Sequence, residues 1–176
     1  KRDGYIENRP LVPISGDQWI VSGPHSSVAN PLFQTPRRVC QTHRAYDSIN
    51  LGEIDDEYFP RTKYSPLKST AELRKILSSV PESWAKQKID SALDLFRHAH
   101  RNYIDLASER TSIPFIIPPG TMHIGTVLSV AFKDTQNLFR LGVGMASILV
   151  DFLVKTTGKP HITDSLVRLF PLMPFE

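Results

Sequence analysis

The first third of the chain alternates short apolar runs with turn-forming residues. Proline, glycine, serine and asparagine are frequent over residues 1–36, and they leave room only for short apolar runs such as Trp19–Val21. A second run, Arg37–Thr42, contains β-branched and apolar residues and begins with two arginines. Because runs of this kind bounded by turn signals are typical of strands, residues 1–66 are predicted to form short strands joined by turns.

Helical spacing begins near residue 69. Ser69 and Glu72 have the spacing of a capping box, and Leu73 and Ile76 follow at helical intervals. A second apolar stripe extends over Glu82–Ala107, opposite a face of lysines, arginines and histidines. That basic face could lie on a phosphate backbone, although a solvated helix face is the commoner arrangement. Residues 67–107 are therefore predicted to form a helical hairpin.

Two histidines of the second predicted helix are two positions apart. On a helix, His98 and His100 would point about 200° away from each other. The spacing therefore does not favour a histidine-based metal site, and the H-E-x-x-H arrangement of metalloproteases is absent from the sequence.

The last part, residues 108–176, has the pattern strand, strand, helix, loop, helix. Ile113–Ile117 and Thr126–Phe132 are predicted to be strands around a Pro-Pro-Gly turn, with Pro114 indicating an edge or a bulge. Asp134 or Thr135 is expected to cap one long helix that ends at Lys155. Together these segments predict an α+β fold, with a small twisted, mostly antiparallel sheet and several packed helices.

Composition limits the class of protein without deciding it. Of the 176 residues, 40% are hydrophobic and 22% are charged, which is typical of one globular domain over residues 1–176. A formal charge of +3 and a pI near 9.1 permit an acidic partner without requiring one. The single cysteine, Cys40, excludes an internal disulfide framework and fits a reducing, cytoplasmic compartment. Because the first residue is Lys1, we expect a fragment of a longer chain.

The usual catalytic motifs are missing from the sequence. There is no G-x-S-x-G, no G-x-x-x-x-G-K-[ST] phosphate loop, and no G-x-G-x-x-G after a strand. A Cys40 nucleophile would need a histidine such as His25 or His43 next to it in space. The acids between Glu53 and Glu57 could hold a metal in a nuclease, but their spacing is that of a short acidic loop. A binding domain is therefore favoured over a self-sufficient enzyme.

Several blocks resemble one family. These are Trp19–His25, Asn30–Cys40, Tyr58–Tyr64, Ser108–Thr111, Ile117–Gly120, His123–Ser129 and Phe152–Lys159. In this order they resemble the part that follows the catalytic domain in large bacterial adenine-specific DNA methyltransferases of restriction-modification and phage-defence systems. That part is the target-recognition, or specificity, domain. The catalytic Asn/Asp-Pro-Pro-Tyr/Phe motif and the S-adenosylmethionine loop of these enzymes do not occur in this sequence.

The resemblance implies sequence-specific binding of double-stranded DNA. S-adenosylmethionine and methyl transfer would then belong to a catalytic methyltransferase domain of the same parent chain or complex, and this chain would hold no cofactor and no metal of its own. Phosphate contacts are expected from Arg37, Arg38, Arg61, Lys63, Arg110, Lys155 and Lys159, and further DNA contacts from Thr111, Thr156, Thr157, His161 and the polar segment Ser22–Asn30. Two alternatives remain: a protein-interaction module whose helices pack on a partner, and a metal-dependent nuclease using the region of Asp55.

Overall fold

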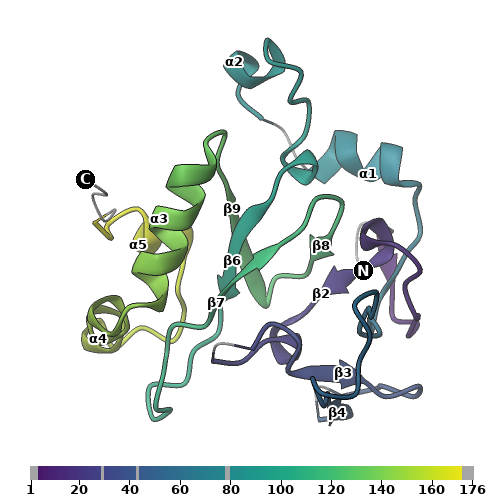
Figure 1. Ribbon diagram of the computed structural model, residues 1–176, viewed down its shortest axis with the longest axis horizontal. Coiled ribbons are helices and arrows are strands. Elements are labelled where there is room, and N and C mark those ends of the chain that lie inside the picture. Colours follow the sequence, from purple (N-terminus) through teal and green to yellow (C-terminus); the bar gives the residue numbers. More distant parts are fainter. Residues whose placement is uncertain (1–3, 29, 43, 78–79, 172–176) are drawn as a thin grey trace.

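The computed structural model describes residues 4–28, 30–42, 44–77 and 80–171, and it has an α+β fold. A three-stranded sheet lies in the middle of the molecule, with the order β7-β6-β9. Figure 1 shows α3, α4 and α5 on one side of this sheet and the strands of the first third on the other. Residues 172–176, the end of the predicted third part, lie outside the described residues.

The central strand is β6, Arg97–Arg101. It pairs antiparallel with β7, Pro114–Ile117, and with β9, Val127–Ala131. The prediction of strands at these last two places is confirmed, and Pro114 lies in an edge strand, where its missing N–H costs no ladder bond.

The helix predicted over Glu82–Ala107 is wrong. Only α2, Glu82–Ala85, and a 3₁₀ turn at Ala92–Asp94 are helical there, and the second arm of the predicted hairpin is largely replaced by β6. Elements pack on both faces of β6, so His98, Ala99 and His100 are fully buried. Polar residues can occupy such a strand because their side chains reach backbone carbonyls: Arg97 Nη2 donates to Thr121 O, and His100 Nε2 lies 3.2 Å from Ile162 O.

The strand also reverses the expectation for the two histidines. Side chains two apart on a strand point to the same face, so His98 and His100 lie together. His100 Nδ1 is 3.3 Å from His98 Nε2. The prediction that they cannot share a face is therefore wrong, because it assumed a helix.

Among the described residues, the strands of the first third take part in three two-stranded pairs, one of them with a strand from the last part of the chain. β1, Ile6–Glu7, pairs antiparallel with β5, Ser65–Pro66, and β3, Gln34–Pro36, pairs antiparallel with β4, Tyr46–Ser48. β2, Ile20–Val21, runs parallel to β8, Met122–His123. A strand within Trp19–Val21 is thus confirmed. The strand predicted at residues 37–42 is wrong, because β3 ends at Pro36 and a loop follows it.

Two helices, α1 and α3, begin where capping residues were expected. α1 is Thr70–Leu77; Ser69 Oγ accepts from Glu72 N, and Ser69 N donates to the Glu72 carboxylate. Asp134 caps α3, Thr135–Ala146, and Thr163 caps α5, Asp164–Val167.

The long helix predicted up to Lys155 is instead two helices. It breaks at Ser147, whose backbone is extended and whose Oγ accepts from Val150 N to begin α4, Ile148–Thr156. Within the described residues no single helix is long and apolar enough to cross a membrane; α3 and α4 pass that test only as a pair, and they meet at a bend of 64°.

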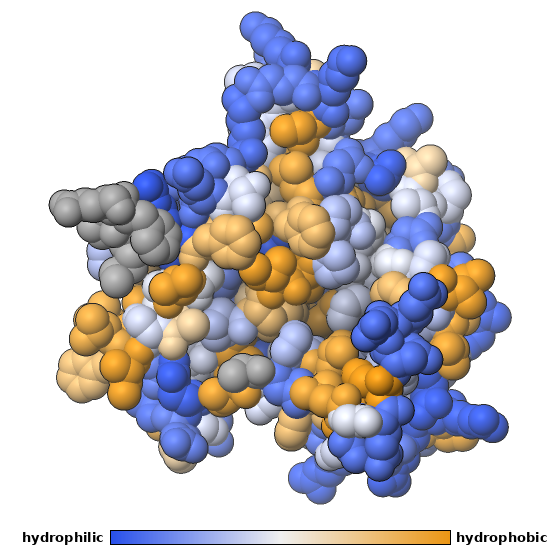
Figure 2. Space-filling view, in the orientation of Figure 1, coloured by the Kyte–Doolittle hydropathy of each residue, from blue (hydrophilic) through white to orange (hydrophobic). Residues whose placement is uncertain are grey.

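Part of the surface of α4 is apolar. Ile148, Leu149 and Phe152 have exposed fractions of 73%, 69% and 65%. Figure 2 shows apolar residues gathered at this corner of the molecule, at the lower left of the view. The opposite side of α4 faces the core.

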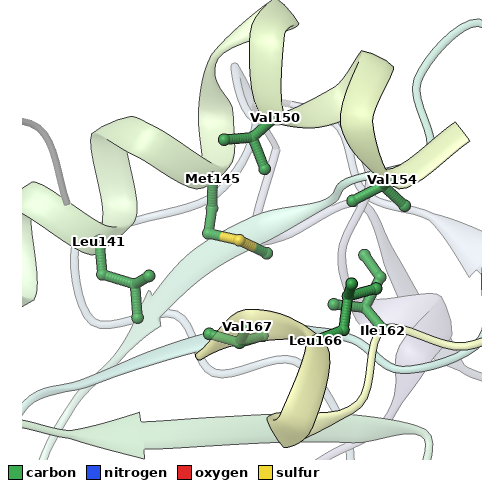
Figure 3. Packing of buried hydrophobic residues seen from close by; sticks show 7 residues of the cluster. All are labelled: Leu141, Met145, Val150, Val154, Ile162, Leu166 and Val167. Atoms are coloured by element: carbon green, nitrogen blue, oxygen red, sulfur yellow. The ribbon is translucent and has the colours of Figure 1, made fainter. Parts of the chain in front are cut away.

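The largest buried cluster joins α3, α4 and α5. It contains Leu141, Met145, Val150, Val154, Ile162, Leu166 and Val167 (Figure 3). A second cluster, which includes Trp19, Val21, Ala99 and Val127, packs the first third against the other face of the central sheet. The two clusters lie on opposite faces of the sheet and pack the flanking elements against it.

Candidate nucleic-acid interface

An exposed polar loop connects β3 and β4, and we call residues 37–45 the β3–β4 loop. The strands pair up to Pro36 and Tyr46, and Arg37 N donates to Ala45 O at 3.0 Å, which closes the base of the loop. Among its described residues, the exposed ones are Arg37, Arg38, Val39, Gln41, Thr42 and Arg44. These residue types contact phosphates and base edges in protein–DNA complexes.

The β3–β4 loop is anchored from beneath. Cys40 turns inward and is 4% exposed. Lys63 Nζ donates to Gln41 O at 3.0 Å, and Arg61 Nε donates to Pro36 O at 2.8 Å. These two hydrogen bonds fix the backbone at Pro36, from which the loop departs, and at Gln41 within the loop.

Two of the predicted phosphate contacts are therefore positioning residues. Lys63 is only 8% exposed, and both its ammonium group and the Arg61 guanidinium are directed to backbone carbonyls. In this conformation they hold the loop that carries the exposed arginines, and they offer little surface to a DNA phosphate.

The exposed arginines differ in their partners. Arg37 forms an ion pair with Asp47, with 2.8 Å between Nε and Oδ1. Within the described residues, the side chains of Arg38 and Arg44 have no ion pair and no hydrogen bond. They are the two loop cations that are free to bind an anion. Arg38 was expected from the sequence. Arg44 was not, because nothing in the sequence around a single loop arginine indicates that it lies near Arg37 and Arg38 in space.

The cysteine shows no sign of a catalytic role. Burial raises the pKa of the Cys40 thiol, which disfavours the thiolate. His25 is fully buried and its Nε2 lies 2.8 Å from Arg61 O. His43 lies outside the described residues. No hydrogen bond joins Cys40 to a described histidine.

A second group of predicted contacts surrounds Asp151, at the junction of α4 with the segment before β7. The Asp151 carboxylate accepts from Thr111 N at 2.7 Å, Thr111 Oγ1 at 2.8 Å and Ser112 N at 2.7 Å. Arg110 Nε is 3.5 Å from the same carboxylate oxygen, and Arg110 Nη2 donates to Ala146 O. Burial acts to raise the pKa of Asp151, but these hydrogen bonds and the charge of Arg110 outweigh it and lower that pKa overall.

This arrangement changes the roles of three residues. Thr111 is 1% exposed, so its hydroxyl is committed to Asp151 and has no surface for DNA. Lys155 Nζ donates to Ser108 O and Glu109 O. Arg110, Thr111 and Lys155 thus tie α4 to the chain before β7.

The remaining predicted contacts lie at the end of α4, in the residues after it, and in the segment Ser22–Asn30. Thr156 and Thr157 donate their hydroxyls to Leu153 O and Val154 O, one turn back in the helix. Lys159 is exposed, and its side chain has no partner among the described residues. His161 packs against Tyr103, with ring centroids 4.6 Å apart. In the segment Ser22–Asn30, Ser22, His25 and Ser26 are buried, and Ala29 lies outside the described residues.

The acidic segment forms no metal cage in the part of the chain that the structure describes. Asp55, Asp56 and Glu57 are exposed, and Asp55 Oδ1 accepts from Glu57 N within its own turn. No group of three or more histidine, cysteine or acidic side chains is placed to hold a metal among the described residues.

Comparisons with known proteins return no relative. No family model, no curated protein and no solved structure matches this chain.

Proposed function

We propose that this chain binds double-stranded DNA in a sequence-specific manner, as the target-recognition domain of an adenine-specific DNA methyltransferase or restriction-modification enzyme. The observation that carries the proposal is the β3–β4 loop: exposed arginines, Gln41 and Thr42 on a loop whose backbone is bound from beneath by Arg61 and Lys63. The resemblance of the sequence blocks supports the class of parent enzyme.

Five of the exposed residues of the loop have distinct parts in such binding. Arg38 and Arg44 suit phosphate oxygens, which fix the position of the protein on the duplex. Gln41 and Thr42 suit base edges in the major groove, where an amide can form a bidentate pair with adenine. Val39, 76% exposed, suits the methyl group of thymine.

The anchored loop also suits the needs of base flipping. A methyltransferase must extrude the target adenine, and unstacking it costs a few kcal/mol. A recognition domain contributes by gripping the surrounding base pairs while a catalytic domain, which would bind S-adenosylmethionine, acts on the flipped base. Residues that are already fixed before DNA binds, as Gln41 is by Lys63, lose less conformational entropy on binding.

Replacing Arg38 and Arg44 together by glutamine should weaken binding to duplex DNA. Each phosphate contact that the variant lacks means that fewer counterions are released on binding. The slope of log affinity against log salt should therefore decrease in magnitude by about two units in all. Near 0.1 M salt this corresponds to a loss of roughly tenfold in affinity per arginine. Fluorescence anisotropy of labelled duplexes across a salt series measures both quantities.

The matched control removes the same charge elsewhere. Lys75 and Lys86 are exposed, and they lie on α1 and just after α2, at the top of the view in Figure 1, whereas β3 and β4 lie at the bottom. Lys75→Gln with Lys86→Gln should leave the slope unchanged. If both double variants lowered the slope equally, the chain would bind DNA by general electrostatic attraction and not through the β3–β4 loop. The absence of salt-dependent binding by the unaltered chain would refute the proposal.

A protein-interaction or assembly module is the second candidate, and the apolar surface of α4 favours it. Leu149→Lys with Phe152→Lys should abolish any concentration-dependent self-association that sedimentation velocity detects, because charge would replace the exposed apolar side chains. Ile14→Lys is the control, since Ile14 is 84% exposed and belongs to a different part of the chain. Self-association that persists in the α4 variant would contradict this use of the surface.

A further inference from the structure

A small polar pocket lies beside the end of β6. It has a volume of about 190 Å³ and is lined by Arg101, Tyr103, Ile104, Asp105, Ser108, Arg110, Thr111 and Ile113. Since one water occupies about 30 Å³ in the liquid, the space is large enough for a phosphate group with some of its hydration. Its charged lining residues are two arginines and one aspartate.

The two arginines of the pocket differ in their charge balance. The charge of Arg110 is offset by Asp151 at 3.5 Å. Arg101 is half-buried, and within the described residues its side chain has no ion pair and no hydrogen bond. Asp105 is exposed and accepts from Ala107 N in its own turn, and no ion pair joins it to Arg101 among the described residues.

A half-buried cation without a counter-charge is costly. Removing a guanidinium from water is unfavourable unless an anion or hydrogen-bond acceptors replace the water. Burial accordingly lowers the pKa of Arg101. Unbalanced charges of this kind are concentrated at binding sites, because there the ligand supplies the missing partner.

The surroundings of Arg101 connect it to the segment that leads into β3. A methyl group added at Gly23 would lie 3.6 Å from Arg101 Nε, so the turn Gly23–His25 lies beside the guanidinium. The same turn binds the residue just before β3, because Phe33 N donates to His25 O at 2.7 Å. In Figure 1 the β3–β4 hairpin and the segment that follows β6 both lie in the lower half of the molecule.

We propose that Arg101 and its pocket bind a phosphate group, which in the DNA-binding function proposed for this chain is a backbone phosphodiester. Arg101 supplies the charge-assisted hydrogen bonds. The Ser108 hydroxyl is a further donor on the pocket wall. This contact is separate from those of Arg38 and Arg44, so the duplex would be held at two places joined by the turn Gly23–His25.

The first test measures DNA binding. Arg101→Gln should decrease the salt slope by about one unit and weaken binding roughly tenfold near 0.1 M salt, whereas Arg101→Lys should keep the slope. Arg168→Gln is the matched control, because Arg168 is exposed at the end of α5 and paired with Asp164. If Arg101→Gln binds like the unaltered chain while the Arg38 and Arg44 variant loses slope, this inference is wrong and the proposed function stands.

The second test needs neither DNA nor a variant. Inorganic phosphate titrated into the ¹⁵N-labelled chain should shift the Arg101 Nε–Hε resonance in a saturable way and leave that of Arg168 unaffected. Saturation here without any DNA binding would support the phosphate site and reject the proposed function. A linear shift shared by all exposed arginines would overturn the site.

Discussion

Replacing Asp151 by alanine should lower the free energy of unfolding by about 3–5 kcal/mol, the cost of removing one partner from a buried ionic network. The variant would leave the backbone N–H groups of Thr111 and Ser112 buried without an acceptor, and it would also strip Arg110 of its counter-charge. Urea unfolding at neutral pH, followed by circular dichroism, measures the change.

Asp151→Asn separates the contribution of the charge from that of the hydrogen bonds. Its side-chain oxygen can still accept the same hydrogen bonds but without a charge, and neutral hydrogen bonds are about half as strong as charge-assisted ones. Its loss should therefore be clearly smaller than that of the alanine variant. Equal losses in the two variants would show that the charge, and not the hydrogen bonding, is what matters.

Lowering the pH should remove the stabilisation that the Asp151 carboxylate provides. The folded pKa of Asp151 lies below the ordinary value of 3.8, so the folded chain binds fewer protons than the unfolded chain as the carboxylate titrates. The stabilisation is complete above the ordinary value and is lost as the pH falls through the folded pKa. The difference between the unaltered chain and Asp151→Asn should accordingly shrink below about pH 4.

The second large effect is a loss of stability in mild acid caused by the histidines of β6. Burial lowers the pKa of His98 to about 3 and that of His100 to about 4, against an ordinary value of 6.5. Below about pH 6.5 the unfolded chain therefore takes up protons that the folded chain cannot. Stability should fall with pH through this window by about 1.4 kcal/mol per pH unit for each histidine.

A single and a double variant separate the contributions of the two histidines to the pH dependence of stability. His98→Gln should reduce the pH slope of the unfolding free energy by about one proton, and adding His100→Gln should reduce it by about one more. Urea unfolding between about pH 5 and 7.5 gives the slopes. Buried His25 and His123, whose pKa values burial also lowers, contribute equally to all three chains and cancel in the comparison. An unchanged slope in His98→Gln would contradict the assignment.

The parts of the fold that were predictable are those governed by neighbouring residues. A cap and a helical apolar spacing lie within a few positions of each other, so the sequence indicates the starts of α1 and α3 directly. β6 could not be read in this way. Its sequence Arg-His-Ala-His-Arg is polar, and its burial depends on elements distant in the chain that pack on both faces and on the carbonyls of Thr121 and Ile162, which accept from its side chains.

The same division applies to the candidate site. The adjacent arginines Arg37 and Arg38 follow a proline, and both are exposed, as such a pair in a sequence indicates. Lys63 and Lys155 bind backbone carbonyls, Gln41 O and Ser108 O, that lie 22 and 47 positions away, which local sequence does not indicate. A lysine bound to a distant carbonyl and a lysine free in solution have the same local sequence signal.

The parallel pairing of β2 with β8 affects how the chain is made. Ile20 pairs with Met122, so 102 positions separate the partners. At a synthesis rate of about 5–20 residues per second, the apolar segment around Trp19 waits about 5–20 seconds for its partner to emerge from the ribosome. Until then Trp19 and Val21 lack Ala99, Ile117 and Val127, the later residues of their cluster. The nascent first third thus offers chaperones an open apolar segment, and a transcript cut short before β8 would yield a product that cannot close this core.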